Sequence, residues 1–119
     1  MPGKDQHLTQ AAHNEKLAET LSRTAYVDWA VTVLFYAALH YVDAILAVSQ
    51  VNPDNHGERQ TEIKRNDTLK RIYPEFRYLQ VQSRNARYLV LPPNGINLVE
   101  AKKQFDIVRA HVRSRLGLD

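Results

Sequence analysis

One long apolar stretch, residues 25–48 (AYVDWAVTVLFYAALHYVDAILAV), constrains most strongly what this chain can fold into. No other part of the sequence is so long or so apolar. A helix that is apolar nearly all round needs cover on every side, so it belongs at the centre of a fold. We therefore expect residues 25–48 to form a central helix, with Trp29 and Ile45 on its apolar surface.

The few polar groups of this stretch fall on one side of the expected helix. At about 100° per residue they occupy an arc of roughly 120°. Burial of such groups is costly unless each finds a partner, and the arginines and histidine later in the chain are the available partners. We expect Asp28, His40 and Asp43 to face the third and fourth helices, either as a ligand site or as a network that holds helix register. The full set is Asp28, Thr32, Tyr36, His40 and Asp43.

The apolar stretch is long enough to cross a membrane, but its composition argues against a span. Asp28, His40 and Asp43 would lie at separate depths, where each charge is expensive in hydrocarbon. The first ten residues, MPGKDQHLTQ, are polar and contain no apolar segment of a secretory signal. We expect a cytoplasmic protein without membrane contact.

Composition limits the size of the fold and the available chemistry. The 119 residues predict a single domain, 1–119. The chain has no cysteine, which excludes disulfides, thiolate catalysis and cysteine-bound metal. Residues 56–90 carry eight Lys and Arg against four acids, whereas residues 1–50 carry three against five. A basic second half suits a partner that bears phosphate, although it also suits a solvated helix surface.

The remaining sequence predicts four more helices and no strands. Thr24 is the expected N-cap of the central helix, and Asn97 with Glu100 resembles a capping box. Breaks are predicted around Pro53 and at residues 91–95 (LPPNG). No segment alternates over strand lengths, so the fold class is an all-α antiparallel bundle of about five helices. The four further helices are expected at residues 5–22, 57–72, 74–89 and onwards from Asn97.

The expected fourth helix has two distinct faces. A spacing of 3, 4, 3 and 4 residues from Phe76 to Val90 predicts a packing seam with small residues at its middle. The neighbouring face is cationic. Its members are Arg77, Arg84, Arg87, Tyr88 and Leu91.

The last helix has a seam of the same 3/4 spacing. Two such seams offer more apolar surface than a small five-helix monomer needs to bury, which predicts a homodimer. The seam of the last helix consists of Leu98, Ala101, Phe105, Val108 and Val112.

The sequence lacks the motifs of phosphate-binding loops and of metal sites. The four glycines, at positions 3, 57, 95 and 117, do not form a phosphate-binding loop. The five histidines show no spacing that would place metal ligands on one helix face. We therefore expect no metal and no cofactor.

Three segments together resemble a known family. They are the long helix WAVTVLFYAALHYVDAILA, the loop sequence HGER that begins at His56, and SRNARY at residues 83–88. This pattern, from about Tyr26 to the last helix, is similar to the HEPN domain (higher eukaryotes and prokaryotes nucleotide-binding). The resemblance implies a bundle of four or five helices, commonly dimeric. It also implies a link to RNA cleavage, to toxin–antitoxin or defence systems, or to nucleotidyltransferase partners.

Members of that family that cleave RNA carry an arginine, often followed by a polar residue, and a histidine after four to six further residues. Arg84 and Asn85 resemble the first half of this signature, but residues 89–91 (LVL) occupy the positions of the histidine. An arginine cannot act as the proton acceptor that metal-independent cleavage requires. The incomplete signature argues against ribonuclease activity.

These observations predict a domain that binds RNA or a nucleotide without full ribonuclease activity, as a homodimer. Guanidinium groups suit phosphate because their donors form a planar fork. One alternative is a ribonuclease in which His40 or His56 replaces the missing histidine. Another is a protein-interaction module that pairs with an antitoxin or nucleotidyltransferase-type partner. The predicted ligand-binding residues are His40, His56, Arg59, Arg84, Arg87 and Tyr88.

Overall fold

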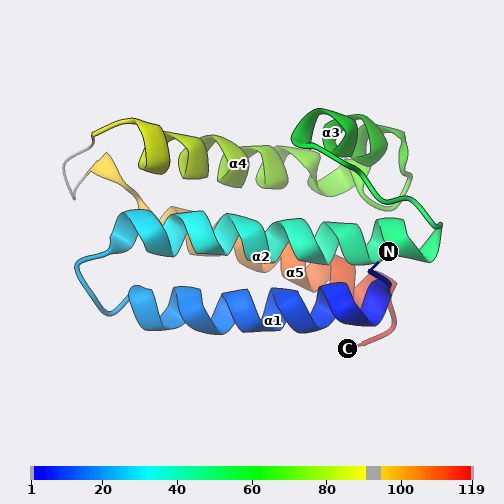
Figure 1. The fold of residues 1–119 in the computed structure, drawn as a ribbon, viewed down its shortest axis with the longest axis horizontal. Coiled ribbons are helices and arrows are strands. Elements are labelled where there is room, and N and C mark those ends of the chain that lie inside the picture. Colours follow the sequence, from blue (N-terminus) through cyan, green and yellow to red (C-terminus); the bar gives the residue numbers. More distant parts are fainter. Residues whose placement is uncertain (1, 91–94, 119) are drawn as a thin grey trace.

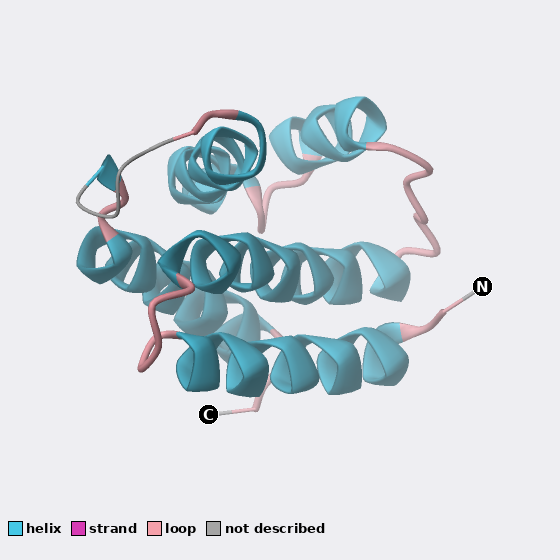
Figure 2. Cartoon of the chain, turned by 60° about the vertical axis from the view of Figure 1, so that its left-hand side comes forward, coloured by secondary structure: helices cyan, strands magenta, loops and turns pink. Residues whose placement is uncertain are grey.

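The computed structural model describes residues 2–90 and 95–118, and this part of the chain contains helices and no strands (Figures 1 and 2). The helices pack into a globule with extents of 41 × 26 × 24 Å. The predicted all-α bundle is therefore confirmed. The helices are α1 (Lys4–Leu21), α2 (Val27–Val48), α3 (His56–Arg65), the short 3-10 helix η1 (Lys70–Ile72), α4 (Tyr73–Tyr88) and α5 (Leu98–Arg115).

The long helix α2 is the centre of the bundle, as predicted. It packs against α1, α4 and α5, and in Figure 1 it runs between α1 below and α3 and α4 above. By length and hydropathy α2 qualifies as a membrane span, but 72% of its most apolar window is buried inside the protein. It is thus the core helix of a globule. Trp29 differs from the prediction, because 53% of its surface is exposed at the start of α2.

Two predicted helix boundaries are wrong for local reasons. Thr24 does not cap α2, because its hydroxyl accepts a hydrogen bond from the Tyr26 amide and α2 begins at Val27. The third helix does not run to Ile72 but ends at Arg65. There the Asn66 side chain accepts hydrogen bonds from the amides of Thr68 and Leu69, which turns the chain out of the helix.

Packing seams hold α4 and α5 against α2. Phe76, Leu79 and Ser83 of α4 are buried as the 3/4 spacing predicted, and so are Ala101, Phe105, Val108 and Val112 of α5. Val90 is fully exposed, because α4 ends at Tyr88 and the seam ends with it. Asn97 caps α5 by accepting a hydrogen bond from the Glu100 amide, as predicted. The predicted break at 91–95 lies mostly outside the described residues, as does Leu91 of the cationic face.

Candidate functional site

A broad groove of about 1190 Å³ lies where α3 and α4 meet α2. Its walls bring together four of the six predicted site residues. The described residues that line it include arginines, amides and aromatic rings but no carboxylate. They are Tyr36, His56, Gln60, Arg77, Gln80, Val81, Arg84, Asn85, Arg87, Tyr88 and Leu89.

Arg87 joins α4 to α2 within the groove. Its Nη1 donates a hydrogen bond of 2.7 Å to the Tyr36 hydroxyl. Its guanidinium also lies over the rings of Tyr36 and Tyr88, at 5.7 and 5.4 Å from their centroids. The Nε atom of Arg87 is buried and has no hydrogen-bond partner among the described residues. These contacts hold a cation in a defined orientation at the middle of the groove.

Arg84 and Tyr88 stand on the outer wall of the groove. Arg84 is exposed and has no ion pair or hydrogen bond with any described residue. Tyr88 is 74% exposed, although a phenol ring of this kind is usually covered at least in part. A free guanidinium next to an exposed ring presents a charge for phosphate and a face for stacking.

Arg59 lies behind the groove rather than on its wall. Its Nε and Nη2 donate hydrogen bonds of 2.8 and 2.9 Å to the two carboxylate oxygens of Asp43. The pair is buried, with 7% of Arg59 and 5% of Asp43 exposed. The predicted meeting of the polar stripe of α2 with a later arginine is confirmed here. Because its fork is taken by Asp43, Arg59 is placed to position its neighbours rather than to reach a ligand directly.

His56 occupies the first position of α3, at the edge of the groove. Asn55 caps this helix by accepting a hydrogen bond from the Glu58 amide, which places the His56 ring against Phe35, with centroids 5.7 Å apart. The Nδ1 of His56 lies 3.4 Å from Nη1 of Arg59. Burial, followed by the charges of Arg59 and Arg87, lowers the pKa of His56, while Asp43 opposes the shift. At neutral pH the imidazole is therefore mostly uncharged and able to accept a proton.

His40 does not line the groove, and its predicted orientation toward the third and fourth helices is not what the structure shows. Its Nδ1 lies 3.1 Å from Nδ1 of His7 on α1, and the two ring centroids are 5.3 Å apart. Burial and the charge of His7 lower the pKa of His40, while Asp43 raises it and Arg59 lowers it. Asp28, by contrast, borders a small hollow beside Ala86 and Arg87 of α4, as expected.

Five polar lining residues were not predicted as site residues. They are Tyr36, Gln60, Arg77, Gln80 and Asn85. Gln60 of α3 donates a hydrogen bond of 2.7 Å to Oε1 of Gln80 on α4, and Arg77 donates one of 3.1 Å to the same oxygen. Arg77 was assigned to the cationic face but not to the site. The available signal was its spacing, since it precedes Arg84 by two helical turns. The two glutamines carry no such signal, because their meeting depends on how α3 packs on α4.

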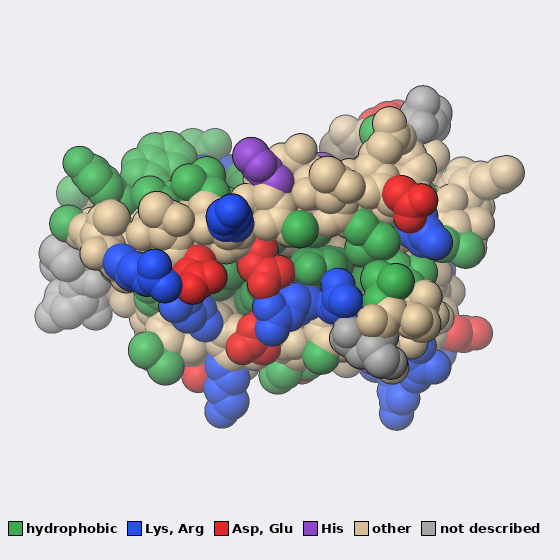
Figure 3. Space-filling view, turned by 90° about the horizontal axis from the view of Figure 1, so that it is seen from below, with side chains coloured by type: hydrophobic (Ala, Val, Ile, Leu, Met, Phe, Trp, Pro, Cys, Tyr) green, Lys and Arg blue, Asp and Glu red, His purple; other side chains and the backbone are tan. Residues whose placement is uncertain are grey.

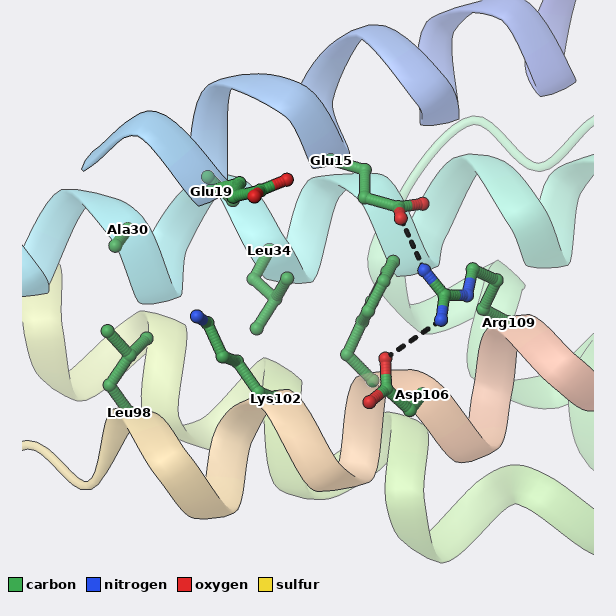
Figure 4. Close-up of a pocket in the computed structure, with 10 residues that line it drawn as sticks. Glu15, Glu19, Ala30, Leu34, Leu98, Lys102, Asp106 and Arg109 are labelled. Carbon is green, nitrogen blue, oxygen red and sulfur yellow. Dashed lines mark hydrogen bonds and ion pairs between the residues drawn. The ribbon is translucent and has the colours of Figure 1, made fainter. Parts of the chain in front are cut away.

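A second hollow, between α1 and α5, is a weaker candidate. Figure 4 shows Arg109 of α5 bridging Glu15 of α1 and Asp106, and the Arg109–Asp106 distance is 3.2 Å. Acidic and basic side chains also lie intermingled on the surface that Figure 3 shows. Three acids against two bases line this hollow, so it offers no excess of positive charge to a ligand that bears phosphate. Among the described residues, no group of three or more His, Asp or Glu side chains is arranged to hold a metal ion.

The groove thus differs from the other hollows in being lined by cations and aromatic rings without acids. Comparison of the chain with protein-family models, with curated proteins and with solved structures found no match.

Proposed function

We propose that this protein binds RNA or a nucleotide in the groove between α3 and α4. One observation carries the proposal: Arg84, Arg87 and Tyr88 line a groove whose described residues include no carboxylate. Phosphate needs positive charge and hydrogen-bond donors, and a base needs an aromatic face. The groove supplies both within two turns of one helix.

Each residue has a role that follows from its contacts. Arg84 reaches the phosphate, since nothing in the described protein holds its guanidinium. Arg87 contributes charge from a fixed position, because the Tyr36 hydroxyl accepts a hydrogen bond from its guanidinium. Tyr88 stacks on a base. Arg59 acts from behind, through Asp43 and His56.

The test is a titration of labelled single-stranded RNA with wild type, Arg84→Ala, Arg87→Ala and Tyr88→Ala. Loss of stacking on Tyr88 is expected to cost about 1–3 kcal/mol of binding free energy, and each arginine variant is expected to lower both the affinity and its salt dependence. Lys103→Ala, an exposed lysine of α5 outside the groove, is the matched control and should bind as wild type does. Wild type that binds neither RNA nor nucleotides at low salt would overturn the proposal.

A ribonuclease is the second candidate, favoured by the position of His56 beside the arginines. An uncharged imidazole at the groove edge is able to accept the proton of a ribose 2′-hydroxyl, which no arginine can do. Gel analysis of the same RNA distinguishes the candidates. Cleavage that is abolished in His56→Ala while binding is retained supports the ribonuclease, and RNA that stays intact with wild type supports binding alone.

We further propose a HEPN-like module that acts in the cytoplasm, in a toxin–antitoxin or defence setting. Its support is the resemblance of the long helix, HGER and SRNARY to that family. A homodimer or a nucleotidyltransferase-type partner fits the exposed apolar residues at one end of the bundle, among them Tyr26, Trp29 and Val90.

A further inference from the structure

We infer that the ligand of the groove is a single-stranded oligonucleotide of about four or five nucleotides that lies along α4, with Arg77 as an additional phosphate contact. This inference rests on the proposed function and specifies its ligand. A mononucleotide would use only one end of the site. The length, the shape and the polar lining of the groove favour the longer ligand.

The cations and the exposed ring extend along α4 rather than forming one cluster. Arg77, Arg84 and Tyr88 follow one another at intervals of seven and four residues, which places them on the same face of the helix. Eleven residues at about 1.5 Å each separate the ends of this row by roughly 16 Å. A stacked, helical strand advances by about 3.4 Å per nucleotide along its axis, so a strand parallel to α4 would place about five nucleotides along the row.

The shape of the groove also favours a chain over a small molecule. Small-ligand sites typically have volumes of about 300–1,000 Å³ and enclose most of the ligand surface. This groove, at about 1190 Å³, is larger, and its outer wall consists of exposed side chains. A single nucleotide would leave most of it empty, whereas a strand that enters and leaves at its two ends would fill it.

Side-chain amides lie between the two cationic ends. Oε1 of Gln80 accepts hydrogen bonds from both Gln60 and Arg77, so it links α3 to α4 and fixes the direction of Arg77. Asn85 also lines the groove, between Arg84 and Arg87 in sequence. Amide groups both donate and accept hydrogen bonds, which suits the edges of unpaired bases. Cations and amides therefore alternate along α4 before the exposed ring, an arrangement that suits a strand of several nucleotides. The order is Arg77, Gln80, Arg84, Asn85, Arg87 and Tyr88.

A length series with the full chain tests this inference. Labelled RNAs of one, two, four, six and eight nucleotides are titrated by fluorescence anisotropy at several salt concentrations. The affinity should rise with length and level off near five nucleotides. Each arginine contact adds about 0.7 to the steepness of the plot of log affinity against log salt. With three contacts the hexamer should show a slope of about −2. The slope for the mononucleotide should be shallower than about −1.4.

The variants separate the two ends of the row. Arg77→Ala should weaken hexamer binding by about tenfold and leave mononucleotide binding unchanged, because a charge-assisted hydrogen bond is lost only for the longer ligand. Arg84→Ala should weaken both. Arg71→Ala, an exposed arginine of η1 that does not line the groove, is the control and should change neither.

Mononucleotide binding that equals hexamer binding in affinity and salt slope would overturn the inference and leave the proposed function standing. An Arg77→Ala protein that binds the hexamer as wild type does would overturn it as well. If no RNA of any length and no nucleotide binds, the proposed function fails together with it. The three outcomes are distinct because the mononucleotide reports on the Arg84 end alone.

Discussion

At the scale of single residues, the buried pair of Asp43 and Arg59 connects the core of the protein to its candidate site. Asp43 belongs to the central helix, and Arg59 lies directly behind His56 at the groove edge. Both carboxylate oxygens are occupied by the guanidinium fork, which is the geometry that makes a buried pair tolerable. The pair therefore sets the position of α3 relative to α2.

Removing one partner of this pair should destabilise the fold strongly. Asp43→Ala leaves the Arg59 charge buried without compensation, and a loss of about 3–5 kcal/mol in the free energy of unfolding is expected from urea denaturation. Glu19→Ala breaks an exposed pair between α1 and Arg23, just beyond the end of that helix, and serves as the control, with an expected loss of under about 1 kcal/mol. Equal losses in the two variants would show that the buried pair contributes no more to the free energy of unfolding than the exposed pair does.

Burial of His40 should make stability depend on pH. Burial lowers the pKa of His40 below its ordinary value of 6.5, so the unfolded chain takes up the proton first as the pH falls. The contribution of His40 to the free energy of unfolding is thus complete above pH 6.5. It decreases as the pH falls from there through the pKa of His40 in the folded state. His56, whose pKa is also lowered, acts in the same direction.

Urea unfolding between pH 7.5 and 5 checks this dependence. Wild type should lose stability across that range, and His40→Asn should lose less, because one of the two groups no longer titrates. His13→Asn removes an exposed histidine of α1 and should follow the wild-type curve. If the stability of His40→Asn decreased with pH as steeply as that of wild type, His40 would not contribute to the pH dependence.

At the scale of helices, α3 determines whether the groove has a second wall. It has only ten residues, from His56 to Arg65, and few apolar ones, so its ends matter more than its length. Asn55 satisfies the Glu58 amide at the start, and the side chain of Asn66 turns the chain at the end. These two asparagines define the helix that places His56 against Phe35 of α2 and joins Gln60 to Gln80 of α4.

Loss of the cap should therefore weaken both the fold and binding. Asn55→Ala is expected to lower the free energy of unfolding by about 0.5–2 kcal/mol and to weaken RNA binding, since His56 and Gln60 are then held less firmly. Asn97→Ala removes the equivalent cap of α5, a helix none of whose described residues lines the groove, and should cost similar stability with RNA affinity retained. Equal effects of both variants on binding would show that α3 has no particular role in the groove.

At the scale of the whole molecule, one end of the bundle exposes apolar side chains that a second copy could cover. The seams of α4 and α5, on which the homodimer prediction was based, are buried inside the single chain. Apolar side chains nevertheless remain exposed near the start of α2 and beyond the end of α4. A second copy would have to use this end, where Tyr26, Trp29, Leu89 and Val90 are exposed.

If the protein is a homodimer, light scattering should return twice the chain mass of 13.7 kDa. Trp29→Asp should then shift the particle to the monomer mass, because a charge in an apolar interface is poorly tolerated. Val48→Asp, at the opposite end of α2 and equally exposed, should leave the dimer intact. A wild-type particle of 13.7 kDa at high concentration would contradict the prediction.

The sequence by itself determined the parts of this protein that depend on neighbours along the chain. The central helix, the seams from Phe76 and Ala101, the Asn97 cap and the row of arginines on α4 all follow from helical spacing, which repeats every few residues. These features required no knowledge of what lies opposite. Arg84, Arg87 and Tyr88 of the groove were predictable for that reason, whereas His56 was predicted from the loop sequence HGER.

Only the tertiary structure decided which faces meet. His40 met His7 of α1, 33 positions away, instead of the arginines, and Arg59 became buried behind the groove. Gln60 and Gln80 became partners across α3 and α4. Such pairings depend on the crossing angle and the sliding of one helix along another, and many distant side chains set these together. Periodicity shows which residues share a face, whereas packing decides what that face contacts.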